Sequence, residues 1–288
     1  MVSKHIIIGI TVFLLLISCG NNQDETSTVL WAVVSETENR YESEFDDLLR
    51  MIAEEADEKI EVVSYDSQSE LLEALEKQQH PFDITVFDAI TYLDARQDGK
   101  ITPGVVGIIQ GNPTFTSQIV VRHDSDITRV KNLKGASFAV PDLSSLDGWI
   151  IPKMTLISSG IDPEQDLSRI VSTGSHKDVL LAVYNGTADA GATYVDARIE
   201  GSKENPEIWK DVRVIALTED IPNTGIFIHT DLAGNRKNKI INSFIKISDT
   251  AEGKKLLDSV FSWSDLIKVN DTFYNPVRVL FKTRISGN

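Results

Sequence analysis

GSHKDVLLAVYNGTADAGA, residues 174–192, is the stretch of this sequence with the clearest structural pattern. Ser175 opens a predicted helix, because a serine hydroxyl can accept a hydrogen bond from an amide of the first turn. The helix is predicted to stop at Asn185 and Gly186, since glycine readily adopts the left-handed conformation that ends helices. Residues 170–172 before the helix and 188–192 after it are short runs typical of strands. The stretch therefore predicts a strand–helix–strand unit.

The same alternation extends outward in both directions. Residues 29–34 form an apolar run typical of a buried parallel strand. Ser67 and Glu70 form a capping box that opens a helix, and Asp88 caps a short one. Further strands are predicted at residues 60–63, 82–87, 105–109, 118–121, 137–140, 212–217 and 225–228, and residues 239–281 are predicted to be helical. This alternation predicts an α/β fold with mostly parallel sheets. Since domains cluster near 100–150 residues, it also suggests two lobes.

The first 19 residues have the features of a bacterial lipoprotein signal. Lys4 supplies a basic start, and residues 6–17 form an apolar run too short for a membrane-spanning helix of about 20 residues. The run ends in Leu-Ile-Ser-Cys, which resembles the lipobox whose cysteine receives a lipid. Cys19 is the only cysteine of the sequence; an ordinary secretory signal would leave it as a lone exposed thiol. We therefore predict a signal peptide over residues 1–18, a lipidated tether over 19–27, and a membrane anchor at Cys19.

Composition excludes several classes of function. The formal net charge is −15, which argues against nucleic-acid binding because that needs a basic surface. The five histidines are far apart in the sequence, and no cysteine pair or His-x-x-x-His spacing is present. The sequence therefore predicts neither a metal site nor a cofactor.

Several blocks of the sequence resemble one family of binding proteins. They are residues 82–87, 115–121, 132–139, 160–163, 174–192 and 221–223. They resemble the PhnD-like phosphate, phosphite and phosphonate-binding proteins of ABC transporters. The resemblance implies a bilobal periplasmic-binding-protein fold, type II-like, with a hinged cleft between two α/β lobes. Residues 28–118 and 225–288 would form lobe one, residues 119–224 would form lobe two, and the chain would cross near 118–122 and 225–229.

Two loops of lobe two could hold an oxyanion, because helix N-termini present free amides and a positive dipole end. One loop contains Ser144 and Ser145, and the other contains Ser175 and His176. The resemblance implies that both loops face the ligand. Helix capping is the alternative for Ser144 and Ser175, since it is the commonest role of such serines. The resemblance adds further candidate ligand-binding residues, namely Phe115, Ser117, Asp196 and Thr224.

The sequence departs from the family pattern at positions that bear on ligand choice. The serine-rich loop is about two residues longer and gains Asp147, and Phe115 stands where the family often has tyrosine. Thr224 replaces an acid, whereas Asp196 keeps an acid that the family places near the far end of the ligand. A carboxylate at position 147 disfavours a fully charged phosphate but can accept a hydrogen bond from a ligand; the alternative is that Asp147 points to solvent. We therefore expect a small oxyanion other than simple inorganic phosphate.

Three classes of function follow from these observations. The first is a lipid-anchored binding protein of the cell envelope that delivers a small oxyanion to an ABC permease. The second is a sensor module that reports the ligand to a membrane signalling protein. The third, an enzyme, is disfavoured because the enzymes with this fold are cytosolic, and because the Ser243 and Lys246 spacing lies in an apolar helix. We therefore expect a binding protein without catalytic residues.

Overall fold

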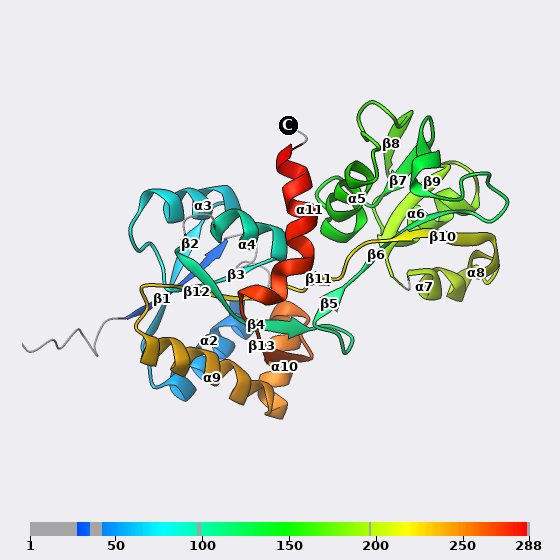
Figure 1. Ribbon diagram of the computed structural model, residues 1–288. Coiled ribbons are helices and arrows are strands. Elements are labelled where there is room, and N and C mark those ends of the chain that lie inside the picture. Colours follow the sequence, from blue (N-terminus) through cyan, green and yellow to red (C-terminus); the bar gives the residue numbers. More distant parts are fainter. Residues whose placement is uncertain (1–27, 35–41, 97–98, 196, 287–288) are drawn as a thin grey trace, which may run out of the picture.

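The computed structural model describes residues 28–34, 42–96, 99–195 and 197–286. These residues form two α/β lobes, each built around one mixed sheet (Figure 1). The predicted α/β bilobal fold is therefore confirmed. The predicted signal peptide, the tether and Cys19 lie outside the described residues. Among the described helices, none is long and apolar enough to cross a membrane.

Lobe one contains a six-stranded sheet in the order β13–β4–β12–β3–β1–β2. Its strands are β1 (Val29–Val34), β2 (Ile60–Tyr65), β3 (Ile84–Phe87), β4 (Ile101–Ile108), β12 (Gly225–His229) and β13 (Asp265–Lys268). Its helices are α2 (Glu42–Ala56), α3 (Gln68–Lys77), α4 (Ala89–Ala95), α9 (Gly234–Ser248) and α10 (Ala251–Phe261). Helices α2, α9 and α10 pack on one face of the sheet, and α3 and α4 pack on the other.

Lobe two contains a five-stranded sheet in the order β10–β6–β9–β7–β8. Its strands are β6 (Ser117–Arg122), β7 (Ser137–Val140), β8 (Arg169–Ser172), β9 (Ala190–Tyr194) and β10 (Val212–Leu217). Its helical elements are η2 (Val130–Leu133), η3 (Leu146–Ile150), α5 (Ile151–Ser158), α6 (His176–Tyr184), α7 (Ala197–Glu204) and α8 (Ile208–Asp211). Three parallel strands beside one antiparallel strand recur in both lobes, so the two sheets share this arrangement, and lobe one adds β13 at its edge.

The predicted helix caps are present. The hydroxyl oxygens of Ser67 and Ser175 accept hydrogen bonds from the amides of Glu70 and Asp178, respectively. One carboxylate oxygen of Asp88 accepts from the amides of Ile90 and Thr91 in the first turn of α4. Helix α6 ends at Tyr184 with Asn185 as its C-cap, and Gly186 follows with a φ of 70°, the left-handed conformation expected of a helix stop.

Two short strands connect the lobes. Strand β5 (Thr114–Phe115) pairs antiparallel with β11 (Ile221–Pro222). The crossing therefore lies a few residues earlier in each segment than predicted, because residues 118–122 belong to the sheet of lobe two and residues 225–229 to that of lobe one. Both segments are apolar strands, so their hydropathy alone does not distinguish a crossing strand from a sheet strand.

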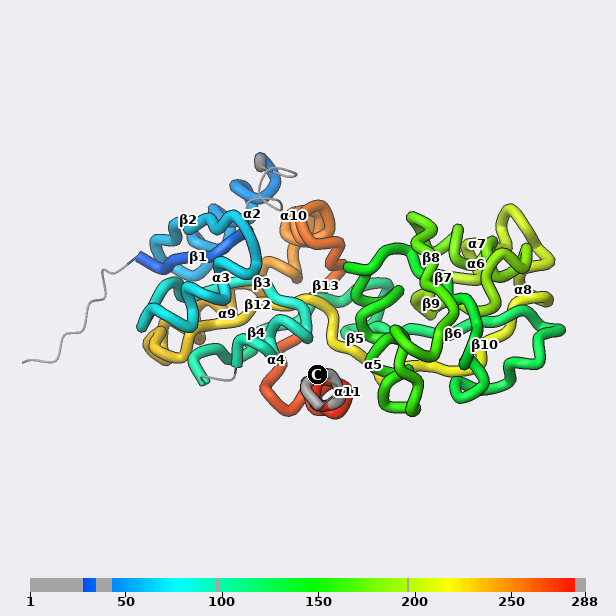
Figure 2. Tube along the Cα trace, turned by 90° about the horizontal axis from the view of Figure 1, so that it is seen from above, coloured from blue at the N-terminus to red at the C-terminus, as the bar shows by residue number. Residues whose placement is uncertain are grey.

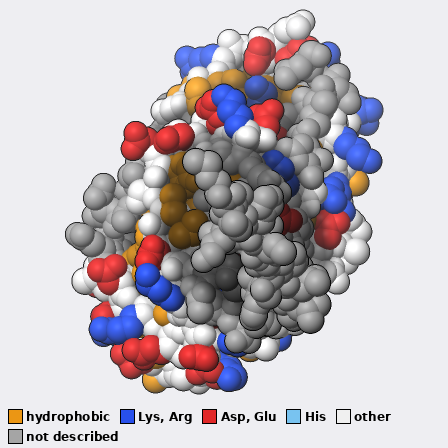
Figure 3. Space-filling view, turned by 90° about the vertical axis from the view of Figure 1, so that its left-hand side faces the viewer, with side chains coloured by type: hydrophobic (Ala, Val, Ile, Leu, Met, Phe, Trp, Pro, Cys, Tyr) orange, Lys and Arg blue, Asp and Glu red, His pale blue; other side chains and the backbone are white. Residues whose placement is uncertain are grey.

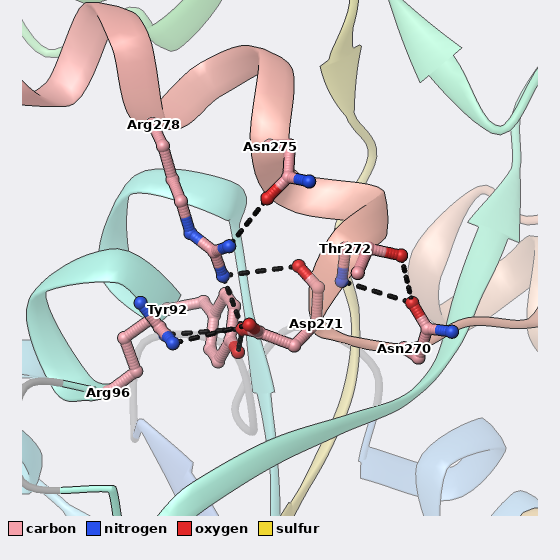
Figure 4. Close-up of polar contacts among 7 residues, drawn as sticks. All are labelled: Tyr92, Arg96, Asn270, Asp271, Thr272, Asn275 and Arg278. Atoms are coloured by element: carbon pink, nitrogen blue, oxygen red, sulfur yellow. Dashed lines mark hydrogen bonds and ion pairs between the residues drawn. The ribbon is translucent and has the colours of Figure 1, made fainter.

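Helix α11 (Asn275–Ser286) makes a further connection between the lobes, and it lies between them when viewed from above (Figure 2). It follows η4 (Asp271–Tyr274), where the Asp271 carboxylate binds Tyr92 and Arg96 of lobe one and Arg278 of α11 itself (Figure 4). The buried α11 side chains Val277, Leu280 and Phe281 share one apolar core with Ile151 and Met154 of α5. The C-terminal helix is thus anchored on lobe one and packed on lobe two.

Two predictions about secondary structure were incomplete. Residues 239–281 were expected to be helical throughout, yet they include β13, which forms the outer edge of the lobe-one sheet beside β4. The sheets were expected to be mostly parallel. In each sheet, only three neighbouring strands pair parallel with one another. The strand that follows each crossing, β6 in lobe two and β12 in lobe one, pairs antiparallel with both of its neighbours.

Candidate functional site

The candidate site lies where strands of lobe two end. Parallel strands β7 and β8 finish side by side, with Val140 paired with Ser172. The amides of Thr173 and Gly174 then donate to the carbonyls of Val140 and Pro141 at 2.9 and 2.8 Å. The two predicted anion-binding loops are therefore adjacent. Ligands of open α/β folds bind outside the carboxyl ends of parallel strands, so this position is suitable for a ligand.

The first loop is organised by its own polar side chains. The hydroxyl and amide of Ser144 both donate to the Asp142 carboxylate, at 2.6 and 2.8 Å. The hydroxyl oxygen of Ser145 accepts from the Gly148 amide at 3.0 Å and caps η3, a π-helical turn. Capping in this loop thus falls to Ser145 and not to Ser144. Single π-helical turns occur frequently at functional sites.

The two loops meet through a histidine and a carboxylate. His176 Nε2 lies 3.3 Å from Oδ1 of Asp147, and the Ser145 hydroxyl donates to the same oxygen at 2.9 Å. The His176 ring packs edge-on against Tyr194, with 4.9 Å between ring centroids. His176 Nδ1 is buried and lacks a hydrogen-bond partner within the described parts of the chain. Nε2 of His176 therefore contacts Asp147, whereas Nδ1 has no hydrogen-bond partner among the described residues.

Asp147 is oriented toward His176, and its side chain is 31% exposed. Burial alone would raise the pKa of this carboxyl. The hydrogen bond and charge of His176, together with the Ser145 hydroxyl, outweigh burial and lower the pKa of Asp147. A carboxylate therefore stands beside the candidate oxyanion loop, 3.3 Å from the His176 imidazole.

The remaining predicted residues are spread along the connection between the lobes. Phe115 lies in β5 and packs against the core shared with α11. Ser117 is fully buried at the start of β6, and its amide donates to the Thr218 hydroxyl oxygen at 2.9 Å. The Thr224 hydroxyl oxygen accepts a hydrogen bond from the Trp263 indole at 3.1 Å. Asp196 lies outside the described residues.

Two cavities lie beside the loops and strands that carry the predicted site residues. The larger, of about 940 Å³, lies between α4 of lobe one and the η3–α5 segment of lobe two, and Ser144 lines it. The smaller, of about 450 Å³, lies at the ends of β1 and β3 and includes Thr224. Gln68 and Asp88 line both cavities, which therefore adjoin. Ser144 of the anion loops lines the larger cavity, whereas Asp147 and His176 line neither.

The lobe-one wall contains residues that the sequence reasoning did not assign to the site. Gln68 begins α3, and its side-chain amide donates to the Thr91 hydroxyl oxygen. Asp88 caps α4 and accepts from the Thr91 hydroxyl at 2.7 Å. The sequence did identify the caps of both helices. It lacked a signal that these two helix starts face the cleft, because that depends on strand order.

The cleft is acidic. Among the described residues that line the larger cavity, one side chain is basic, Lys153, and it lies 3.2 Å from the Glu164 carboxylate. Its acidic side chains are Asp88, Asp94, Asp162, Glu164 and Asp166. Where the end of lobe one is coloured in Figure 3, Lys and Arg side chains are interspersed with Asp and Glu side chains. An oxyanion in this cleft must therefore be held by local amides and hydroxyls.

The Ser243 and Lys246 spacing forms no catalytic pair. Ser243 is buried, and its hydroxyl donates to the Ile240 carbonyl at 2.8 Å. The ammonium group of Lys246 binds the Glu55 carboxylate at 2.6 Å. Each side chain therefore has a structural partner of its own.

Curated relatives and solved structures resemble this chain. The phosphonates-binding periplasmic protein of Escherichia coli strain K12 is 26% identical over 204 residues, which cover 69% of this chain and 60% of that protein. The phosphate-import protein PhnD of Mycolicibacterium smegmatis is 28% identical over 180 residues, covering 59% of this chain and 55% of that protein. The chain thus matches less than two thirds of the length of either relative.

The solved structure of XAC2383 from Xanthomonas citri bound to ATP superposes with a TM-score of 0.67 at 16% identity, covering 90% of this chain and 97% of that one. At this identity the likeness supports the fold alone. The profile of the family described as "ABC transporter, phosphonate, periplasmic substrate-binding protein" matches residues 31–274, which include both lobes and the cleft between them. This chain therefore belongs to the family of periplasmic substrate-binding proteins of phosphonate ABC transporters.

Proposed function

We propose that this protein captures a small phosphonate- or phosphite-like oxyanion in its interlobe cleft and delivers it to an ABC permease. The observation that carries the proposal is the meeting of two helix-start loops, joined by Asp147 and His176, at the ends of adjacent strands. Helix starts supply amide donors for an oxyanion, and His176 adds a donor in its protonated form. Family membership favours transport over the sensor alternative, for which no specific observation speaks.

The proposed ligand carries fewer negative charges than a phosphate dianion, or bears a polar group as well. Asp147 keeps a carboxylate beside the candidate anion site, and the cleft walls are rich in acids. Like charges disfavour a dianion there, whereas a carboxylate accepts a hydrogen bond from a ligand hydroxyl or amine. A partly protonated phosphonate or phosphite meets both conditions.

The test is a thermal-shift screen of methylphosphonate, an aminophosphonate, phosphite, phosphate, sulfonates and carboxylates. A ligand at a hundredfold excess over its Kd stabilises the protein by about 2.7 kcal/mol, which is visible as a higher melting temperature. We expect a phosphonate or phosphite to give the largest shift, and His176→Ala to reduce that shift. The exposed His123→Ala variant is the matched control. A largest shift with inorganic phosphate would contradict the role of Asp147, and no shift with any oxyanion would contradict the transport proposal.

We further propose that Cys19 is acylated and anchors the protein at the outer face of the membrane. The support is the apolar run of residues 6–17 that ends in a lipobox-like Leu-Ile-Ser-Cys. Cys19→Ala should move the protein from the membrane fraction to the soluble fraction after cell lysis. Cys19→Ala protein that still sediments with membranes would disprove the anchor.

A further inference from the structure

Two histidines that are distant in the sequence meet on lobe one. His80 precedes β3 and His229 ends β12, and these strands pair antiparallel, with Ile228 opposite Ile84. The two imidazole rings stack with 4.4 Å between centroids and 11° between planes. Asp231 follows two residues after His229, and its amide donates to His229 Nδ1 at 3.2 Å. The fold thus assembles a His–His–Asp cluster that the spacing of histidines in the sequence did not predict.

The cluster combines one buried residue with two exposed ones. His229 is 1% exposed, and its Nε2 is buried without a hydrogen-bond partner in the described portion of the chain. A buried polar atom without a partner is unfavourable, and native proteins rarely leave one unexplained. Because Nδ1 accepts from the Asp231 amide, the neutral ring carries its proton on Nε2, and a metal ion bound at Nε2 would require that proton to move to Nδ1 as the Asp231 amide turns away. His80 and Asp231 are exposed on the surface beside it, with side-chain exposures of 37% and 53%. A ligand could therefore reach the cluster from solvent.

His80 is oriented in the way that metal-binding histidines usually are. His80 Nε2 lies 2.8 Å from Oδ1 of Asp83, whose other oxygen accepts from the Leu30 amide at 2.7 Å. Asp83 itself is buried. A carboxylate that accepts from one imidazole nitrogen fixes the ring and leaves the lone pair of the other nitrogen available, which is the common outer-shell arrangement of metal-binding histidines.

We propose that His80, His229 and Asp231 bind a divalent transition-metal ion, with zinc as the best match. One imidazole nitrogen from each histidine and one carboxylate oxygen already lie within 4.8 Å of one another. Tetrahedral zinc with bonds of about 2.0–2.2 Å needs ligand atoms roughly 3.3–3.6 Å apart. Turning the exposed Asp231 side chain and tilting the His80 ring about its hydrogen bond to Asp83 would bring both toward the buried His229 and close this difference. A water molecule completes the fourth position. Two imidazoles with one carboxylate favour zinc over magnesium or calcium, which prefer oxygen ligands.

The metal site is separate from the ligand cleft. Asp88, which lines the cleft, follows the last residue of β3, whereas His80 and Asp83 precede the first residue of that strand. The cleft and the metal site therefore lie at opposite ends of β3. Zinc would join the α3–β3 connection to the segment after β12, and both belong to lobe one. A bound ion is therefore expected to stabilise lobe one without contacting the oxyanion.

The test compares zinc binding by variants of the protein without a polyhistidine tag. We expect calorimetry to find one zinc ion per chain and the melting temperature to rise with zinc concentration. His80→Ala and Asp231→Ala should each weaken zinc binding at least tenfold, whereas the exposed His123→Ala should not. Both altered side chains are exposed, so the variants should fold.

Three results would overturn the proposal: no zinc-dependent shift of the unmodified protein, an equal shift in His80→Ala and Asp231→Ala, or an equal shift with magnesium. Oxyanion affinity measured in parallel should stay unchanged in His80→Ala. A protein that binds zinc but no oxyanion would refute the transport proposal and leave the metal site intact.

Discussion

The contact between Asp147 and His176 can be tested by a double-mutant cycle with His176→Ala, Asp147→Asn and the combined variant. The two side chains approach to 3.3 Å and are 31% and 23% exposed, so they are neither free in solvent nor fully buried. A hydrogen bond to a charged group contributes roughly 1.5–3 kcal/mol when protected. An exposed ion pair contributes about 0–1 kcal/mol. We therefore expect a coupling free energy of about 1 kcal/mol, measured by urea unfolding at neutral pH.

The same coupling should depend on pH in one direction. Because the pKa of Asp147 is lowered in the native protein, its carboxylate stabilises the fold above the pKa of the unfolded state. That contribution is lost as the pH falls through the native pKa. The coupling should therefore be present at neutral pH and disappear in acid.

The cycle also tests ligand binding. His176→Ala removes a donor at the candidate oxyanion site and should weaken binding about tenfold or more, equivalent to ~1.4 kcal/mol. Asp147→Asn removes a negative charge beside the candidate oxyanion site. At an effective dielectric constant of ~20, a carboxylate charge and a phosphate charge ~6 Å apart repel each other by about 3 kcal/mol. Since the Asp147 side chain is 31% exposed and solvent screens part of this repulsion, we expect inorganic phosphate to bind about tenfold more tightly to Asp147→Asn. Titration calorimetry measures both constants, with His123→Ala as the control. A coupling below about 0.3 kcal/mol with unchanged phosphate affinity would refute this account of the site.

Three further predictions follow from the cleft, the C-terminal helix and the lobe-two sheet. Saturating ligand should reduce the radius of gyration measured by X-ray scattering, because a hinged cleft closes around its ligand; an unchanged radius would contradict closure. Asp271→Ala removes the acceptor of the buried Tyr92 hydroxyl and should lower the free energy of unfolding by about 1–2 kcal/mol, an effect absent if α11 is not anchored there. Gly191→Ala would place a Cβ atom 2.6 Å from Val179 and should destabilise the protein by about 1–3 kcal/mol; wild-type stability would show that the sheet can adjust.

Much of the secondary structure could be predicted because its signals are local. Ser67, Asp88 and Ser175 cap helices through amides two or three residues away, and these bonds need no distant partner. Strand β13 was missed because it is a four-residue edge strand in which only Leu266 is buried, and its pairing with β4 is not encoded nearby. The position of the crossing between the lobes was likewise misplaced by a few residues.

The candidate site was predictable only in part. The two anion loops could be located because each begins a helix after a strand, and the extra Asp147 was visible in the sequence. Whether that carboxylate points to solvent or toward His176 depends on β7 and β8 lying side by side, which brings the loops together. The lobe-one wall with Gln68 and Asp88 likewise depends on how the lobes face each other.

The sequence by itself determined the α/β class, the helix caps and the resemblance to phosphonate-binding proteins, because hydrophobic periodicity and capping act between near neighbours. Only the tertiary structure decided which distant residues meet. His80 and His229 seemed unrelated in the sequence, yet antiparallel pairing of β3 with β12 stacks their rings. In the same way, η4 and α11 return to lobe one and place Asp271 against Tyr92. Contacts of this kind depend on the order of strands in the sheet and on where the C-terminal segment packs. Burial of the whole core decides both, rather than any local sequence pattern.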